Sequence, residues 1–139
     1  MCGIFLVISK KKLNKKKCIN SETFIKSRGP DVTNNSFFFN KRVFLSNSIL
    51  SITGKIENKN KLSISKSKNY VLSFNGEIFN WRELARQFNF KQSQSDAQLL
   101  INLFDKISPE NVSRKINGMF AFCVIDKKKK VVNFATDPQ

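Results

Sequence analysis

Six apolar stretches of the sequence have the length and the residue types of β-strands. They are Ile4–Ile8, Ser36–Phe39, Arg42–Ser48, Tyr70–Phe74, Met119–Ile125 and Val131–Ala135. The second and third are separated by Asn40-Lys41, which predicts a hairpin, and the last two by Lys127–Lys130, which predicts another. The fourth stretch stops at Asn75-Gly76, a dipeptide typical of tight turns.

Three helix starts are marked between the fourth and fifth strands. Asn80 with Glu83 has the form of a capping box and predicts a helix to about residue 88. Ser95-Asp96 repeats the signature ahead of apolar residues at helical spacing, and Ser108-Pro109 places proline at its favoured first position. The polar segments 9–20 and 55–69 are expected to be loops, the second with a short strand at 62–64. Strands and helices in these groups indicate the α+β class.

Length and composition narrow the classes of protein that fit. A chain of 139 residues suits one domain with a packed core. It contains no apolar run near the ~20 residues of a membrane span and no secretory signal, so no membrane partner is expected. Cys2, Cys18 and Cys123 are too far apart for a disulfide framework or a zinc site. We therefore expect no bound metal and a reducing, cytoplasmic location.

The formal net charge of +15 raises a basic nucleic-acid-binding module as a remote alternative. Most of the excess is lysine, in clusters at Lys10–Lys12, Lys15–Lys17 and Lys127–Lys130. No aromatic side chains are interleaved with these clusters to stack on bases. Solvated loops are the simpler interpretation, and nucleic acid is not the expected partner.

The chain has no histidine, which removes Cys-His and Ser-His-Asp catalysis. Cys2 follows the initiator methionine, so removal of Met1 would leave a thiol and a free α-amine on one residue. A terminal amine titrates near pH ~7.7–8 in its unperturbed state, and it can act as the base that a thiol nucleophile needs. The alternative is that Cys2 is only a small apolar residue at the start of a strand.

Six short motifs occur in a fixed order along the whole chain. They are Met1-Cys2-Gly3-Ile4-Phe5, Arg28-Gly29-Pro30-Asp31, Leu50-Ser51-Ile52, Asn75-Gly76-Glu77-Ile78-Phe79-Asn80, Ser95-Asp96 and Gly118-Met119-Phe120-Ala121-Phe122. Together they resemble the glutaminase domain of class II (N-terminal nucleophile) glutamine amidotransferases, and the asparagine synthetase type most closely. Each motif alone is weak, but six in register are specific.

The resemblance implies a four-layer αββα sandwich that hydrolyses the side-chain amide of L-glutamine to glutamate and ammonia. Cys2 would be the nucleophile, while Asn75 and Gly76 would supply the donors of an oxyanion hole. Glu77 and Asp96 would hold the α-amino end of glutamine. No cofactor is implied in this domain, because ATP and magnesium would belong to a synthetase domain.

The substrate-binding segment departs from the family pattern. It comprises Ile49, Leu50, Ser51, Ile52 and Thr53. Family members have an arginine at position 49 that binds the glutamine α-carboxylate, and Lys41, Arg42 or Lys55 are candidates to replace it. The family also places a histidine where this chain has Ser27, and an arginine where it has Thr136.

The resemblance further implies that residues 1–139 form an incomplete glutaminase domain, truncated at the C-terminus, and that the synthetase domain is absent. A separate synthetase domain or subunit would then be the protein partner. The alternative function is a degenerate, non-catalytic glutaminase-like domain that acts in partner binding, and Ile49 and the truncation favour it.

Overall fold

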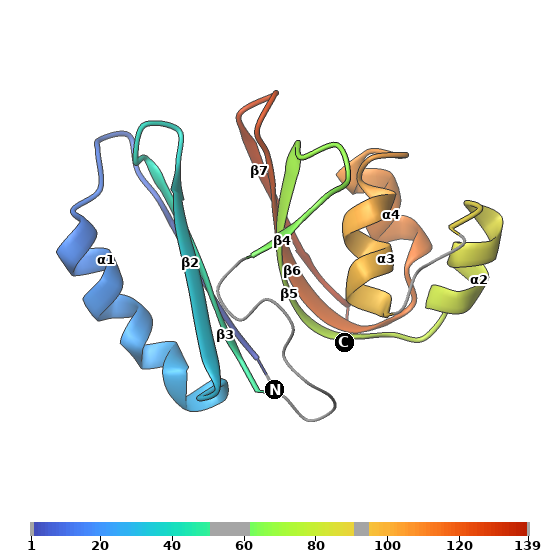
Figure 1. Cartoon of the computed structure of the whole chain (residues 1–139), viewed down its shortest axis with the longest axis horizontal. Coiled ribbons are helices and arrows are strands. Elements are labelled where there is room, and N and C mark those ends of the chain that lie inside the picture. The colour runs from blue at the N-terminus through green and yellow to red at the C-terminus, as the bar shows by residue number, and fades with distance from the viewer. Residues whose placement is uncertain (1, 51–61, 91–94, 139) are drawn as a thin grey trace. The chain divides into compact units, whose positions relative to one another are not determined.

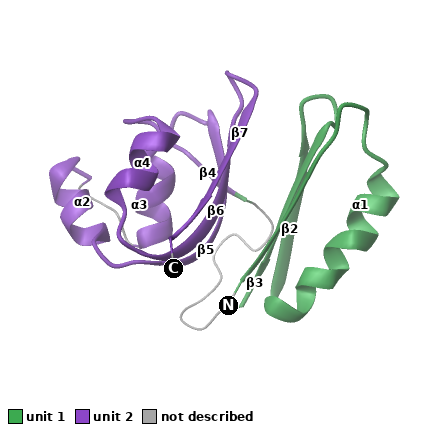
Figure 2. Cartoon of the chain, turned by 180° about the vertical axis from the view of Figure 1, so that it is seen from behind, with its two compact units in different colours: residues 1–62 green, residues 63–139 purple. Residues whose placement is uncertain are grey.

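The computed structural model describes residues 2–50, 62–90 and 95–138 (Figure 1). The chain divides into two compact units, Met1–Leu62 and Ser63–Gln139 (Figure 2). Each unit contains one antiparallel sheet with helical structure on one face, so the predicted α+β class is confirmed. One sheet and one helical layer per unit is what an αββα sandwich requires; the stacking of the four layers stays a prediction.

The first unit is built on a three-stranded sheet. Its strands are β1 (Gly3–Ile8), β2 (Val32–Phe38) and β3 (Val43–Ile49), in the order β1-β3-β2. The predicted hairpin of β2 and β3 is confirmed, and Phe39, Asn40 and Lys41 all have positive φ in its turn. Strand β3 is central, and Val43 to Ser48 are all buried.

Residues 9–20 are not the simple loop that the sequence predicts. Helix α1 (Lys15–Glu22) begins there, and a 3₁₀ helix, η1 (Thr23–Arg28), continues it. The Asn14 side chain caps α1 by accepting a hydrogen bond from the Lys17 N–H at 3.0 Å. The prediction failed because α1 has no apolar stripe.

A buried carboxylate, and not an apolar stripe, connects α1 to the sheet. Glu22 is only 4% exposed. Its oxygens accept hydrogen bonds from Asn35 Nδ2 at 2.9 and 3.0 Å and from Ser46 Oγ at 2.7 Å. A buried charge is tolerated when hydrogen bonds satisfy it, and here they come from both β2 and β3.

The second unit contains a four-stranded sheet and three helices. The strands are β4 (Ser63–Ile64), β5 (Tyr70–Ile78), β6 (Gly118–Asp126) and β7 (Val131–Thr136), in the order β4-β5-β6-β7. The helices are α2 (Trp81–Gln87), α3 (Asp96–Leu103) and α4 (Pro109–Lys115), on one face of the sheet (Figure 1). Ser95 and Ser108 cap α3 and α4 as predicted. The core between helices and sheet includes Leu72, Ile78, Leu99, Leu100, Phe104, Val112, Phe122 and Val124.

Strand β5 does not stop at Asn75-Gly76 but continues to Ile78. Gly76 has φ +138° and Gly118, on β6, has φ +159°, so both adopt extended backbone that L-residues rarely enter. A Cβ at Gly76 would lie 2.1 Å from the Met119 carbonyl oxygen, and one at Gly118 would lie 2.0 Å from that of Glu77. The two glycines therefore permit a close approach of the paired strands β5 and β6, and they do not form a turn.

Asn80 is at the cap position of α2, but its side chain makes no capping hydrogen bond. Its Nδ2 donates to the Lys115 carbonyl at 2.9 Å and its Oδ1 accepts from the Asn117 N–H at 2.9 Å. The predicted capping box is therefore wrong. Asn80 instead ties the end of α4 to the end of β5, just before β6 begins.

We expect Glu22→Ala to lower the free energy of unfolding by about 2–3 kcal/mol, because Asn35 and Ser46 would lose a charged acceptor in a buried site. Urea unfolding measures the effect. The matched control is Glu110→Ala, which removes an exposed ion pair to Arg114 at 3.2 Å and should cost less than ~0.5 kcal/mol. Equal effects of the two substitutions would contradict the anchoring role of Glu22.

Candidate active site

The first unit places Cys2 beside Ile49. Gly3–Ser48 is the last pair of the β1–β3 ladder, and Cys2 and Ile49 are the next residues of the two segments, so both lie at this end of the sheet. Cys2 is partly exposed. The predicted nucleophile and the first residue of the predicted substrate segment are therefore neighbours at one end of this sheet.

The Arg28-Gly29-Pro30-Asp31 turn packs against the same end of β3. The Asp31 N–H donates to the Ile49 carbonyl at 3.2 Å. A Cβ on Gly29 would lie 2.3 Å from the carbonyl carbon and oxygen of Ser48, so only glycine permits this approach. A tertiary contact thus explains why Gly29 is needed in this turn.

The same geometry shows which of the cations proposed to replace the missing arginine lie at the Ile49 end of the sheet. Lys41 and Arg42 precede Val43, which pairs with Ile8 at the opposite end of the sheet from Ile49. Lys55 lies outside the described residues. Arg28 is at the right end, since its Cβ is 3.5 Å from the position that a Cβ on Gly3 would occupy.

In the second unit, hydrogen bonds to Phe120 fix the direction of the Gly76 N–H. The Phe120 N–H donates to Asp137 Oδ2 at 2.6 Å, and the Phe120 carbonyl accepts from the Asp137 N–H at 3.0 Å. Both backbone groups of Phe120 thus point away from β5. In an antiparallel ladder this makes Gly76–Phe120 a non-hydrogen-bonded pair. The N–H of Gly76 consequently points away from β6.

Asp96 gives independent support for this orientation. The Ile78 N–H donates to Asp96 Oδ2 at 3.0 Å, on the side of β5 away from β6. Gly76 is two residues earlier on the strand, so its N–H faces the same edge, roughly 7 Å along it. Strand β4 pairs only with Val71 and Leu72 and does not cover this part of β5.

Asp96 itself is held firmly at that edge. Its second oxygen, Oδ1, accepts from the N–H of Ala97 at 2.7 Å in the first turn of α3. Each carboxylate oxygen can accept more than one hydrogen bond, so capacity remains for an ammonium group. The carboxylate and the Gly76 N–H together form a short row of polar groups along one strand edge.

Asn75 and Glu77 share the other face of β5. Phe74 and Ile78 pack toward the helices, so the alternating residues Asn75 and Glu77 project from the opposite face. Glu77 is exposed and Asn75 is partly exposed. A side-chain amide, a backbone N–H and a carboxylate therefore follow one another along β5, and the Asp96 carboxylate bonds the end of the same strand.

The predicted site residues thus fall into two groups, one in each unit. Cys2, Ile49 and the exposed Leu50 lie in the first unit. The second unit contains Asn75, Gly76, Glu77 and Asp96. Ser51, Ile52 and Thr53 lie outside the described residues. No role for Asp137 was predicted from the sequence, where its only signal is an Asp-Pro dipeptide directly after a predicted strand.

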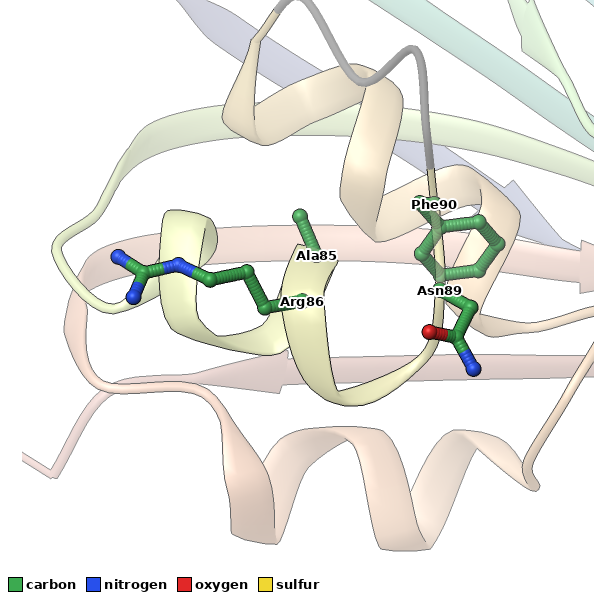
Figure 3. A pocket seen from close by; sticks show the side chains of 4 residues that line it. All are labelled: Ala85, Arg86, Asn89 and Phe90. Atoms are coloured by element: carbon green, nitrogen blue, oxygen red, sulfur yellow. The ribbon is translucent and has the colours of Figure 1, made fainter.

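An open hollow of about 410 Å³ beside α2 does not belong to either group. It is lined by Ala85, Arg86, Asn89 and Phe90 (Figure 3). Arg86 extends away from Asn89 in this view, so the polar groups of the lining do not converge. None of the predicted site residues that the structure describes lines this hollow.

The three thiols differ in their surroundings. Cys18 and Cys123 are buried, at 5% and 1% exposure. Burial raises the pKa of Cys123 to about 12, and burial followed by the nearby Glu22 carboxylate raises the pKa of Cys18. Only Cys2 is partly exposed. It is therefore the thiol best placed to react.

The described residues show neither a metal-binding cluster nor a membrane-spanning helix. They contain no group of three or more acidic, cysteine or histidine side chains that could hold a metal ion. None of the described helices has the length and apolar character needed to cross a membrane.

Comparisons with known proteins support the resemblance to asparagine synthetases. Asparagine synthetases described as glutamine-hydrolyzing are similar over 99% of this chain. The chicken (Gallus gallus) protein is 26% identical, the putative second enzyme of Methanocaldococcus jannaschii 28%, and the probable enzyme of Acanthamoeba polyphaga mimivirus 30%. The chain spans 25%, 30% and 26% of the lengths of these relatives.

A solved structure also aligns with most of the chain. It is the glutamine phosphoribosylpyrophosphate amidotransferase of B. subtilis in complex with ADP and GMP, with a TM-score of 0.47 and 18% identity over 91% of this chain and 29% of that chain. The family model for the glutamine amidotransferase domain matches residues 1–138. The chain therefore belongs to the glutamine amidotransferase domain family and is similar to asparagine synthetases.

Proposed function

We propose that this chain hydrolyses the side-chain amide of glutamine to glutamate and ammonia. The observation that carries the proposal is the shared edge of β5, where the Gly76 N–H points outward beside the anchored Asp96 carboxylate. An outward N–H can stabilise an oxyanion, and a carboxylate on the same edge can bind the α-amino group of the same substrate. Family membership supports glutamine as that substrate.

The proposed reaction begins at Cys2 after removal of Met1. The α-amine takes the thiol proton, and Sγ attacks the amide carbon. Negative charge then develops on the amide oxygen, where the Gly76 N–H and the Asn75 side chain donate hydrogen bonds. The loss of one such donor typically costs ~3 kcal/mol. Return of the proton to the nitrogen releases ammonia and leaves a thioester, which water hydrolyses to glutamate with restoration of the thiol.

Glu77 and Asp96 are proposed to bind the α-ammonium group of glutamine. Asp96 suits this role because two backbone N–H groups fix its orientation before substrate arrives. Ammonia would pass to a synthetase domain or subunit, as the names of the similar asparagine synthetases suggest. That acceptor, like a cytoplasmic location, stays a prediction.

The second candidate function is a non-catalytic glutaminase-like domain that binds a partner. Ile49 favours it, because an apolar side chain stands beside Cys2 where the family has an arginine. Removal of a charge-assisted partner from a bound carboxylate costs roughly 2–5 kcal/mol. Arg28 is the described cation at this end that can offset the loss.

Ammonia release from glutamine should depend entirely on Cys2. We expect Cys2→Ala to reduce the rate to background, because no other described thiol is exposed. Mass spectrometry of the same sample establishes whether Met1 has been removed. Equal ammonia release by the two proteins would reject the proposed function, and a retained Met1 would reject the α-amine as the base.

A glutamine-like electrophile should modify Cys2 in the folded protein and leave Cys18 and Cys123 unmodified at pH 8. With a pKa of about 12, Cys123 has roughly one thiolate per ten thousand molecules at that pH, and its share rises only in strong alkali. Peptide mapping identifies the modified residue. Labelling in urea serves as the control, since all three thiols should then react; a protein that is unlabelled when folded would favour the non-catalytic domain.

Ile49→Arg should strengthen glutamine binding. A guanidinium beside Cys2 restores a partner for the α-carboxylate, so we expect KM to fall about 10- to 100-fold with little change in kcat. Ile8→Arg is the matched control, because it adds the same charge at an exposed position (56%) at the far end of the sheet. The interpretation of position 49 fails if both variants change KM equally or if neither does.

A further inference from the structure

We infer that Asp137 is a positioning residue, which acts through Phe120 to keep the Gly76 N–H directed at the oxyanion. This inference rests on the proposed function and names a residue that neither the motifs nor the family resemblance assigned to the reaction. Asp137 would not touch the substrate. Its contribution would be to the direction of a donor on the neighbouring strand.

Asp137 continues the sheet by one residue with its side chain. The β6–β7 ladder ends at the pair Ala121–Thr136. Beyond it, Asp137 accepts the Phe120 N–H through Oδ2 at 2.6 Å and returns its own N–H to the Phe120 carbonyl at 3.0 Å. Both polar backbone groups of Phe120, a residue only 7% exposed, are satisfied on the β7 side.

This arrangement matters because the facing residue is a glycine in an unusual conformation. Gly76 has φ +138°, and glycine has wider conformational freedom than any other residue. Without the Asp137 carboxylate, the buried Phe120 N–H would require a new acceptor, while the Phe120 carbonyl would keep the backbone N–H of residue 137. The nearest strand on the other side is β5, and bonding there would turn the Gly76 N–H inward.

Asp96 restrains the same segment from the other end. Its bond to the Ile78 N–H fixes the peptide two residues beyond Gly76. The Gly76 peptide therefore lies between two aspartate anchors. Asp96 is also proposed to bind substrate, so its substitution would mix two effects. Asp137 offers the cleaner test.

The test compares Asp137→Ala, Asp137→Asn and the control Asp105→Ala. Asparagine keeps an acceptor oxygen for the Phe120 N–H, whereas alanine does not. Asp105 likewise accepts a backbone N–H, from Ser67 at 2.9 Å, but it lies at the other end of β5. The control therefore removes a similar bond, together with one from Ser67 Oγ, in a region that the proposal does not involve.

We expect Asp137→Ala to lower kcat about 10- to 100-fold with KM within ~3-fold of wild type. The misdirected Gly76 N–H would no longer stabilise the oxyanion, and this charge develops only in the transition state. Asp137→Asn and Asp105→Ala should keep kcat within ~3-fold of wild type. Wild-type kcat in Asp137→Ala would overturn the inference, as would equal losses in Asp137→Ala and Asp105→Ala. A folded but inactive Asp137→Asn would overturn it as well, even if the alanine variant fails to fold.

Amide hydrogen exchange by NMR provides a readout that does not need turnover. The Phe120 amide should exchange faster and the Gly76 amide slower in Asp137→Ala, with both unchanged in Asp105→Ala. Unchanged exchange at both amides would refute the positioning role. If wild type releases no ammonia but exchange shifts as expected, the proposed function fails while the structural control of Gly76 by Asp137 is supported.

Discussion

The second unit depends on the close approach of β5 and β6 at two glycines. At Gly76 and Gly118, an added Cβ would lie 2.1 and 2.0 Å from a carbonyl oxygen of the facing strand. No other residue fits that spacing, and positive φ at both positions adds a conformational cost for any side chain. In this pairing Glu77 lies opposite Met119, and the register determines which backbone groups of β5 face away from β6.

Three polar side chains from separate parts of the chain stabilise this close approach of β5 and β6. Asn80 bonds the backbone just before β6, Asp96 bonds the end of β5, and Asp137 bonds Phe120. All three lie next to strand or helix ends, where backbone groups lack partners from regular structure. Side-chain hydrogen bonds thus determine the direction of the backbone groups on which the proposed role of this unit depends.

The first unit shows a different distribution of polar groups. On the face that packs with α1, Glu22 is fully hydrogen-bonded by Asn35 and Ser46. On the opposite face, Asn34 and Asn47 are paired across β2 and β3, and the side-chain oxygen of each is buried without a hydrogen-bond partner in the described part of the chain. Such groups cost about 1–3 kcal/mol each. The polar groups of the helix-bearing face are therefore better satisfied than those of the opposite face.

The sequence alone determined the strands, the two hairpins and the serine caps of α3 and α4, because period, turn residues and caps are local signals. Motif order predicted Cys2, Gly76 and Asp96 as site residues, and their roles stay proposals. The sequence missed α1, since Glu22 anchors that helix by tertiary hydrogen bonds and no apolar stripe is present. It mistook Asn75-Gly76 for a turn and Asn80 for a cap, because each is defined by contacts with residues some 35 to 45 positions away. Only the tertiary structure decided the direction of the Gly76 N–H, since that direction depends on which side of β6 satisfies Phe120.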